Sequence, residues 1–329
     1  MKIAIDVMGG DFAPQELIAG AKGYLQSDGE AGLILVGDEK VIRELWPDLP
    51  ESCEIYHTNE VIEMGEHPLQ ALRKKKNASV AVCASLVKQG KADGFISAGS
   101  TGAQMAASLL VLGKITGIER PAISVMLPTS GDRGVLLLDV GANVDVRPNH
   151  LLEFALMGSA YYEKICGIER PKVGLLNIGE EEAKGNELTK ATYELLKGSS
   201  LNFVGNVEAD HLFEGKANVV VCDGFVGNVL LKTSEGVSEN MQALVFKTAM
   251  SMGEETVGNF KKAIKKFSPS SPEYSAAPLL GVNGVSLVCH GKSKAPVITN
   301  AIKLAVSCSK SNYVDLITKE LTRTNKSLE

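Results

Sequence analysis

The sequence has little of several features that mark whole classes of protein. Aromatic residues make up 5% of the 329 residues, and only one of them is tryptophan. The formal net charge is −5, and no basic domain is present, which argues against a nucleic-acid-binding protein. No apolar run approaches the ~18 residues that a membrane span needs, and a strand-like pattern follows Lys2 directly. We therefore expect a soluble, cytoplasmic protein without a signal peptide.

Sequence motifs for metal, disulfide and nucleotide chemistry are also missing. The six cysteines form no CxxC pair and no histidine stands at metal-ligand spacing, which predicts buried thiols and no metal site. There is no GxxxxGK[ST] motif and no GxGxxG spacing, so we expect no nucleotide or redox cofactor. A serine nucleophile is not expected either, because the chain has no GxSxG motif.

Strand-like apolar runs alternate with helical patterns along the chain. This rhythm predicts an α/β protein with a three-layer α/β/α, doubly wound and mostly parallel sheet. The predicted strands are Leu33–Gly37, Ala92–Ala98, Ala122–Leu127, Val135–Val140, Lys172–Ile178, Val219–Cys222 and Val285–His290. The predicted helices are Ala78–Lys88, Thr101–Leu112, His150–Cys166, Asn186–Leu196 and Pro296–Ser307. With 44% hydrophobic residues, residues 1–329 can form one such unit or two lobes around a central cleft.

Residues 237–275 break the alternation, because a long amphipathic helical pattern is followed by no strand. We expect this segment to project from the body. Its second half has an apolar face and a lysine face, formed by Phe260, Lys261, Lys262, Ile264, Lys265, Lys266 and Phe267. Such a face fits an anionic membrane surface, and it fits equally a helix that packs on the core or on a second copy through Met241, Leu244 and Val245.

Four loops rich in glycine and small polar residues follow predicted strands. In an open parallel sheet, ligands bind beyond the carboxyl ends of the strands, where helix N-termini and glycine N–H groups converge. Each loop alone is explained by tight turning, but together they predict a shared anion pocket. The loops are Ile3–Pro14, Phe95–Ala103, Gly179–Glu187 and Val219–Asn228.

The third of these loops, with the sequence GEEEAKGNE, places one cation, Lys184, among four glutamates before a predicted helix. A solvated acidic turn that favours the helix N-terminus would explain the glutamates. The lysine instead indicates an anionic ligand. The sequence around this loop leaves both interpretations open.

The ordered motifs of the whole chain resemble the bacterial phosphate acyltransferase family, PlsX. The motifs are IAIDVMGGDFAP (3–14), ISAGSTGA (96–103), LLLDVGANVDVRP (136–148), GLLNIGEEEAKGNE (174–187), VVVCDGFVGNVLLK (219–232), APLLGVNG (277–284) and HGKS (290–293). The resemblance implies transfer of a fatty acyl group from acyl carrier protein to inorganic phosphate, for phospholipid synthesis. It also implies a fold similar to isocitrate and isopropylmalate dehydrogenases, a homodimer, peripheral membrane contact and a membrane-bound glycerol-3-phosphate acyltransferase as a partner. Ser100 departs from the family pattern, where asparagine is usual.

An acyl thioester is already activated, so phosphate can attack it without an enzyme nucleophile, provided that the site orients phosphate and stabilises the oxyanion. We assign the charge contact to Lys184 and hydrogen bonds to Asn186 and Asn228, and Asp223 is expected to orient Lys184 or to accept a proton. We expect eight further residues to bind phosphate or the acyl group, or to orient the residues that bind them. These are Gly9, Gly10, Asp11, Ser100, Thr101, Gly102, Asp139 and Asn143. His67 and His290 are candidate acids for the leaving thiol, or else structural residues.

Acyl carrier protein is strongly acidic, so this acidic chain needs a local basic surface for it. The sequence offers Arg73–Lys76 and the Lys261–Lys266 cluster, either of which can also be a solvated face. Three rival functions are a short-chain phosphotransacetylase that uses coenzyme A, a metal- and nicotinamide-dependent hydroxyacid dehydrogenase, and a non-catalytic peripheral membrane scaffold.

Overall fold

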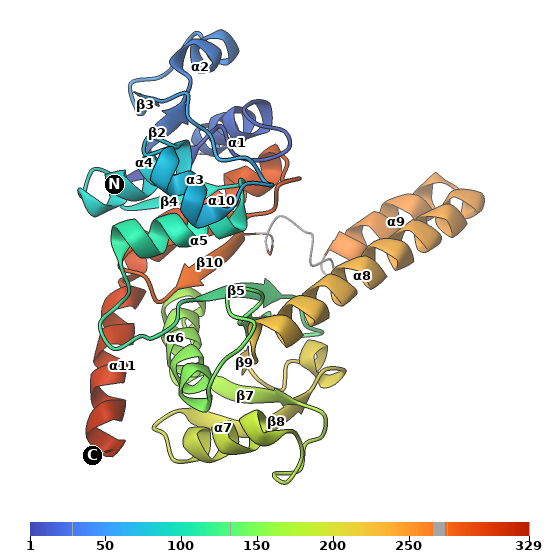
Figure 1. Ribbon diagram of the computed structural model, residues 1–329. Helices are drawn as coiled ribbons and strands as arrows, with labels where there is room; N and C mark the ends of the chain where they lie inside the picture. The colour runs from blue at the N-terminus through green and yellow to red at the C-terminus, as the bar shows by residue number, and fades with distance from the viewer. Residues whose placement is uncertain (28, 132, 266–273, 275, 329) are drawn as a thin grey trace. The chain divides into compact units, whose positions relative to one another are not determined.

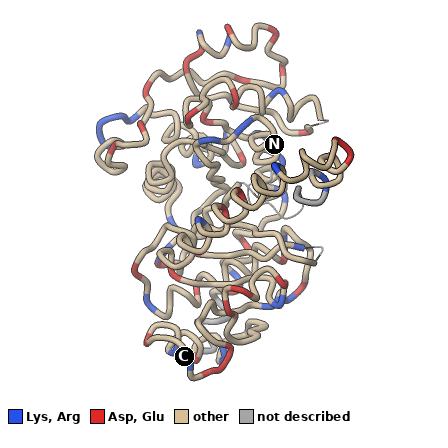
Figure 2. The backbone as a smooth tube through the Cα atoms, turned by 90° about the vertical axis from the view of Figure 1, so that its right-hand side faces the viewer, with Lys and Arg blue, Asp and Glu red and all other residues tan. Residues whose placement is uncertain are grey.

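The computed structural model describes residues 1–27, 29–131, 133–265, 274 and 276–328, and the chain divides into two compact units (Figure 1). Unit 1 comprises Met1–Pro121 and Ala276–Thr322, and unit 2 comprises Ala122–Ser275 and Arg323–Glu329. Lysines and arginines are interspersed with acidic residues along most of the backbone (Figure 2). Among the described helices, none is both long enough and apolar enough to cross a membrane.

The strands of unit 1 form a sheet in the order β3-β2-β1-β4-β11-β10. All neighbouring strands in it are parallel except β10 and β11. The β1 strand pairs on both sides, so that Ile3 is in register with Leu33 and with Gly94. The strand bounds are β1 Lys2–Asp6, β2 Gly32–Gly37, β3 Cys53–His57, β4 Gly94–Ser97, β10 Ala276–Leu280 and β11 Val285–Cys289.

Helices cover both faces of this sheet, which buries its apolar side chains (Figure 1). Helices α1 and α10 pack closely, because Gly20 has no side chain and Ile298 fills the space. Helices α4 and α5 pack together on the other face. The helix bounds are α1 Gln15–Gln26, α2 Glu39–Leu45, α3 Pro68–Lys74, α4 Ser79–Lys88, α5 Thr101–Ala107 and α10 Ala295–Ser311, and a π-helical turn, η1, continues α5 over Ser108–Leu112. Helix α11, Tyr313–Leu328, begins in unit 1, and its residues from Arg323 on belong to unit 2.

The strands of unit 2 follow the order β5-β6-β9-β7-β8. Only the β5–β6 pair is antiparallel. Helices α6 and α7 pack against each other and against these strands. The bounds are β5 Ala122–Leu127, β6 Val135–Leu138, α6 Pro148–Cys166, β7 Lys172–Asn177, α7 Glu187–Lys197, β8 Asn202–Glu208, a short 3-10 helix η2 His211–Glu214, and β9 Val219–Val221.

Two further helices complete unit 2, α8 Gly224–Met252 and α9 Glu254–Lys265. They form a helical hairpin that extends away from the strands of this unit (Figure 1). The helix that contains residue 237 begins earlier than the predicted helical segment, because α8 starts at Gly224, where the Asp223 side chain caps it. The helix ends before Gly253, whose φ of +106° suits glycine and interrupts the helical pattern. Lys266 and Phe267 lie outside the described residues.

The predicted mostly parallel α/β class is confirmed, and the seven predicted strands, together with the strand expected directly after Lys2, β1, are present with small shifts at their ends. Three strands were missed. The β3 strand is largely exposed, β8 contains Asn202, Gly205 and Asn206, and β10 contains Pro278. These residues weaken the apolar alternation by which strands are recognised in a sequence.

Candidate functional site

The candidate residues of unit 1 lie in loops that follow parallel strands. After β1 the chain turns at two glycines, and Gly10 has a φ of +113°. A Cβ atom on Gly9 would lie 2.6 Å from the Asp6 carboxylate and 2.8 Å from the Gly99 nitrogen, so that position also needs glycine. The exposed Asp11 donates its backbone N–H to the Gly291 carbonyl at 2.8 Å, which joins the loop after β1 to the loop after β11.

The loop after β4 leads directly into α5. The Ser100 hydroxyl caps this helix by accepting a hydrogen bond from the Ala103 N–H at 3.3 Å. The N–H groups of Thr101 and Gly102 have no hydrogen-bond acceptor among the described residues. They are therefore available to an anion. Ser100 uses its oxygen as a cap, a role that asparagine also performs at such positions.

A buried carboxylate, Asp6, holds the loops after β1 and β4 together. Asp6 is only 2% exposed, and its Oδ2 accepts a hydrogen bond from the Ser97 hydroxyl at 2.7 Å. The same hydroxyl accepts one from the Gly99 N–H at 3.1 Å. Burial raises the pKa of Asp6, and hydrogen bonds led by that from Ser97 oppose the increase. Asp6 was not predicted as a site residue, although a carboxylate that ends the apolar strand IAID, three residues before two glycines, was a signal for it.

The two histidines proposed as acids are both exposed. His67 precedes α3 at its N-cap position but forms no side-chain cap. His290 follows β11, and its Nδ1 accepts the Lys292 N–H at 3.1 Å. Neither side chain has a described hydrogen bond to the glycine loops. Their proposed role as acids stays a prediction.

The candidate residues of unit 2 centre on Asp139, which follows β6 and is completely buried. Its Oδ1 accepts N–H groups from Ile123 at 3.1 Å and from Ala142 at 3.0 Å. Its Oδ2 accepts both the backbone N–H of Asn143 at 2.7 Å and its side-chain amide at 2.9 Å. Burial raises the pKa of Asp139, and these hydrogen bonds counteract the increase. Asp139 thus fixes the loop and does not contact solvent.

This loop supports the N-terminus of α8. The Asn143 carbonyl accepts the Gly224 N–H at 2.7 Å, and Asp223 caps the helix by accepting the Val226 N–H at 2.9 Å. Asn228 lies one turn into α8 and is exposed. Its side chain comes within 4 Å of the position that a Cβ on Gly141 would occupy, and it has no hydrogen bond to a described residue. Its amide is therefore available as a donor beside a helix N-terminus.

Lys184 lies in the loop between β7 and α7. Its side chain is exposed, and its ammonium group makes no ion pair or hydrogen bond with any described residue. The loop is fixed around it, because Asn177 donates to the Lys184 carbonyl at 3.2 Å and Gly185 turns at a φ of +98°. Asn186 caps α7 by accepting the Thr189 N–H at 2.9 Å, which leaves its NH₂ group as a donor. The backbone around this cation is ordered while its charge stays free for a ligand.

Two of the glutamates beside Lys184 pair with other cations. Glu182 binds Lys197 at 2.8 Å, and Glu180 binds Lys216 at 3.0 Å. Lys216 holds the pKa of Glu180 below its ordinary value. The acidic loop is therefore not a set of counterions for Lys184.

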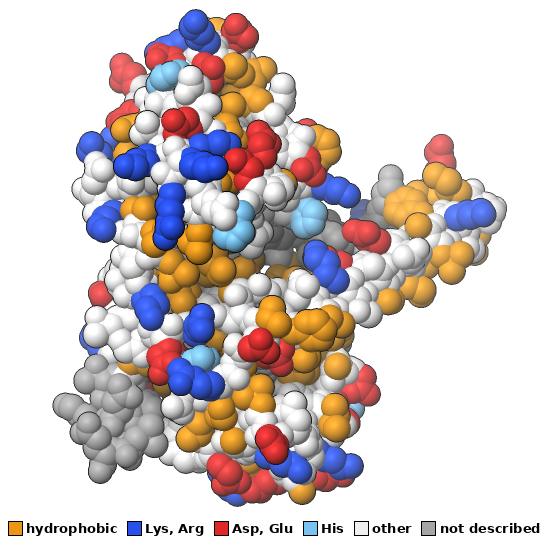
Figure 3. Space-filling model, viewed as in Figure 1, with side chains coloured by type: hydrophobic (Ala, Val, Ile, Leu, Met, Phe, Trp, Pro, Cys, Tyr) orange, Lys and Arg blue, Asp and Glu red, His pale blue; other side chains and the backbone are white. Residues whose placement is uncertain are grey.

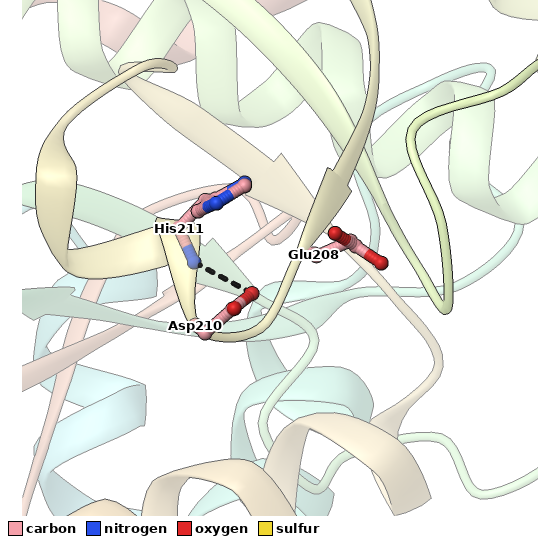
Figure 4. Close-up of side chains that lie close together, drawn as sticks. All are labelled: Glu208, Asp210 and His211. Carbon is pink, nitrogen blue, oxygen red and sulfur yellow. Dashed lines mark hydrogen bonds between the residues drawn. The ribbon is translucent and has the colours of Figure 1, made fainter.

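Glu208, Asp210 and His211 also gather near this loop, and their ligand atoms lie within 4.8 Å of one another (Figure 4). Asp210 accepts the backbone N–H of His211 at 3.1 Å. The Nδ1 atom of His211 lies 3.0 Å from the Lys216 ammonium and 3.0 Å from the Glu180 carboxylate. The Glu180 carboxylate thus contacts both His211 and Lys216, and we interpret these three residues as an ion-pair network that anchors the Lys184 loop to η2.

The cysteines are poorly suited to act as nucleophiles. Burial raises the pKa of Cys53 and Cys166 to about 11 and that of Cys289 to about 12. The pKa of Cys222, which packs on the Asp139 carbonyl, is also raised well above its ordinary value. These thiols are protonated at neutral pH, and it is the thiolate that attacks a thioester.

The chain is similar to known proteins over most of its length. A family model described as "Fatty acid synthesis protein" matches residues 1–316. A phosphate acyltransferase from Desulforamulus reducens is 50% identical over 100% of this chain and 99% of its own length. One from Moorella thermoacetica is 49% identical over 95% of this chain and 94% of its own.

Solved structures share the fold at low sequence identity. A phosphotransacetylase from Streptococcus pyogenes aligns with a TM-score of 0.64 and 19% identity, and 94% of each chain is covered. The EutD phosphotransacetylase from Staphylococcus aureus gives a TM-score of 0.62 at 18% identity over 94% of each chain. The full-length matches to the curated relatives show that this chain belongs to the phosphate acyltransferase family and is an acyltransferase enzyme.

Proposed function

We propose that the chain transfers a fatty acyl group from acyl carrier protein to inorganic phosphate, and that the acyl phosphate feeds phospholipid synthesis. The observation that carries this proposal is the free ammonium group of Lys184, held in an ordered loop of a phosphate acyltransferase. A cation without a protein counterion is what a dianionic substrate requires.

The residues of unit 2 are assigned to catalysis. Lys184 contacts phosphate, and the amides of Asn186 and Asn228 donate to phosphate or to the developing oxyanion. Asp223 orients the start of α8 and can accept a proton from phosphate. Asp139 and Asn143 position that helix, since the Asn143 carbonyl binds the Gly224 N–H.

The loops of unit 1 are assigned to binding phosphate or the acyl thioester. The N–H groups of Thr101 and Gly102 and the glycine turn at Gly10 support this assignment. Asp11 and Ser100 orient these loops through Gly291 and Ala103. Gly9 contributes because any side chain there would collide with Asp6.

In the proposed reaction, the acyl group passes directly from the carrier sulfur to a phosphate oxygen. A phosphate oxygen bonds to the thioester carbonyl carbon, the carbon–sulfur bond breaks, and the carrier leaves as a thiolate that takes up a proton from water. The carrier thiol has a pKa near ~8.5, so its thiolate is a good leaving group and protonation by His67 or His290 is not required. The raised pKa values of the buried thiols support direct attack over an acyl-enzyme.

We also propose that α8 forms a homodimer interface. Val237, Met241 and Leu244 are 55–61% exposed and follow one face of the helix at i, i+4 and i+7. A second copy of this face would bury them. Peripheral contact with a membrane, and with a membrane-bound glycerol-3-phosphate acyltransferase, is assigned to the α9 end of the hairpin, which carries Phe260 and Lys262.

A short-chain phosphotransacetylase is the second candidate, favoured by the fold shared with the solved phosphotransacetylases. A comparison of donors separates the two. Purified protein with phosphate should use palmitoyl-carrier protein at least tenfold more efficiently, by kcat/KM, than acetyl-coenzyme A. The opposite preference would assign the chain to the second function.

A further inference from the structure

Acidic residues are scarce in one stretch of this acidic chain. Between His67 and Ile118 there are seven lysines and arginines but a single carboxylate, Asp93. That stretch has a net charge of +6, in a chain whose net charge is −5. Lysine and arginine side chains gather on the face of unit 1 shown in Figure 3, with a group of carboxylates beside them.

Four of these cations, Arg73–Lys76, lie together at the C-terminal end of α3, where they interact favourably with the negative end of the helix dipole. One of them has a structural task. The Lys75 ammonium donates to the Val61 carbonyl at 2.6 Å and pairs with Glu66 at 2.5 Å, which fixes the loop before α3. Lys75 is therefore not available to a partner.

The other three cations are Arg73, Lys74 and Lys76. All three side chains are exposed, and none forms an ion pair or a hydrogen bond with a described residue. Leu69, one turn earlier on the same helix, is 47% exposed. Exposed cations without a described ion pair, next to an exposed leucine, suit contact with an acidic protein.

This helix adjoins the loop after β4. The first residue of α3, Pro68, lies 2.8 Å from the position that a Cβ on Gly102 would occupy, and α3 packs against α5. From Pro68 to Arg73 the helix rises about 8 Å. A partner bound at Arg73 can thus deliver a group on a flexible arm to the free N–H groups of Thr101 and Gly102.

We propose that Arg73, Lys74 and Lys76 form the docking surface for the acidic carrier protein that donates the acyl group. The inference rests on the proposed function, and it places the carrier on α3 and not on the Lys261–Lys266 segment. Charge complementarity supports this occupant, because the surface combines three exposed cations that form no ion pair with a described residue and proximity to a candidate substrate-binding loop. Membrane lipid is a less suitable occupant because Leu69 is the only exposed large hydrophobic residue of α3 in the described structure.

The test is a triple charge reversal, Arg73→Glu with Lys74→Glu and Lys76→Glu. The matched control reverses three exposed lysines elsewhere in unit 1, Lys88→Glu, Lys91→Glu and Lys303→Glu. At low ionic strength the triple variant should raise the KM for the acyl-carrier donor at least tenfold with kcat unchanged, and the control should raise it less than twofold. Added salt should raise the wild-type KM but change that of the triple variant little.

A small neutral donor, the same acyl group on N-acetylcysteamine, separates docking from catalysis. Its kcat/KM with phosphate should be equal in the wild type, the triple variant and the control. An equal loss with both donors would overturn the docking proposal, because the cations would then act in the reaction itself. The docking proposal would also be overturned if the triple variant had an unchanged KM for the acyl-carrier donor. The same holds if the triple variant lost binding to anionic vesicles but still used the acyl-carrier donor as the wild type does.

Carrier binding can be measured without turnover, so failure of the docking proposal is distinguishable from failure of the proposed function. Titration of the wild type with carrier protein should give a salt-sensitive dissociation constant that the triple variant weakens at least tenfold. Equal affinity of the triple variant and the wild type, or no binding to the wild type, would contradict the docking surface even if phosphate-dependent turnover is present.

Discussion

Replacing Lys184 by alanine should impair catalysis without affecting the fold. The side chain is exposed and has no described ion pair, so its removal leaves no buried carboxylate without a partner. A unit charge 4 Å from a phosphate oxygen contributes ~1 kcal/mol in bulk water and ~4 kcal/mol at an effective dielectric constant of ~20. Because the lysine is exposed, we expect a loss of about 1–3 kcal/mol of transition-state stabilisation, which lowers kcat/KM for phosphate roughly 5- to 150-fold.

The assay measures initial rates over a range of phosphate concentrations for Lys184→Ala, Lys184→Arg and the wild type. The matched control is Lys190→Ala, which removes an exposed cation on α7, in the turn that follows the same loop. Lys190→Ala should retain wild-type kinetics, and Lys184→Arg should retain more activity than Lys184→Ala since it keeps the charge. Near wild-type turnover of Lys184→Ala at both low and saturating phosphate would refute the role of this cation.

Further predictions concern the scaffold. Gly227→Ala should strongly lower the free energy of unfolding measured with denaturant, because the new Cβ would collide with the Asp139 carbonyl. In the control, Gly236→Ala on the same helix, the new Cβ meets nothing within 4 Å, so this change should stabilise the protein by up to about 1 kcal/mol. Similar effects of the two changes would contradict this. Burial raises the pKa of Asp6 above 3.8 in the folded state, so its contribution to stability is fully present below that pH and is lost as the pH rises through the raised pKa. The difference in unfolding free energy between Asp6→Asn and the wild type should therefore vary with pH in this acidic range, and a constant difference would disprove the assignment. Chelators should leave activity unchanged, since direct attack of phosphate on a thioester needs no metal ion; an EDTA-sensitive rate that zinc restores would contradict this and point to the cluster of Glu208, Asp210 and His211.

Much of the fold was predictable because the buried parallel strands are continuous apolar runs. Val135–Leu138 and Val219–Val221 are examples, both buried along their whole length. The strand β8 was missed because its asparagines and glycine do not alternate with apolar residues. The start of α8 was missed because glycines at 224, 227 and 236 weaken the helical pattern, although Gly224 and Gly227 are needed for close approach to the loop of Asp139.

The sequence predicted which loops carry the candidate site residues, but not which contacts those residues make. Glycine turns identified the segments that contain Gly10 and Lys184. The sequence could not reveal that Lys75 is used internally, because its partners Val61 and Glu66 lie in a preceding loop. Nor could it show which glutamates leave Lys184 unpaired, since Lys197 and Lys216 come from other elements.

In the proposed mechanism, phosphate attacks the thioester directly, without an acyl-enzyme. A single-turnover experiment tests it most directly: enzyme in excess over palmitoyl-carrier protein, with and without phosphate, while carrier thiol and acyl phosphate are measured together. We predict that thiol and acyl phosphate appear in equal amounts and at the same rate, and only when phosphate is present. Release of carrier thiol without phosphate, together with labelled acyl group retained on the protein, would contradict the mechanism.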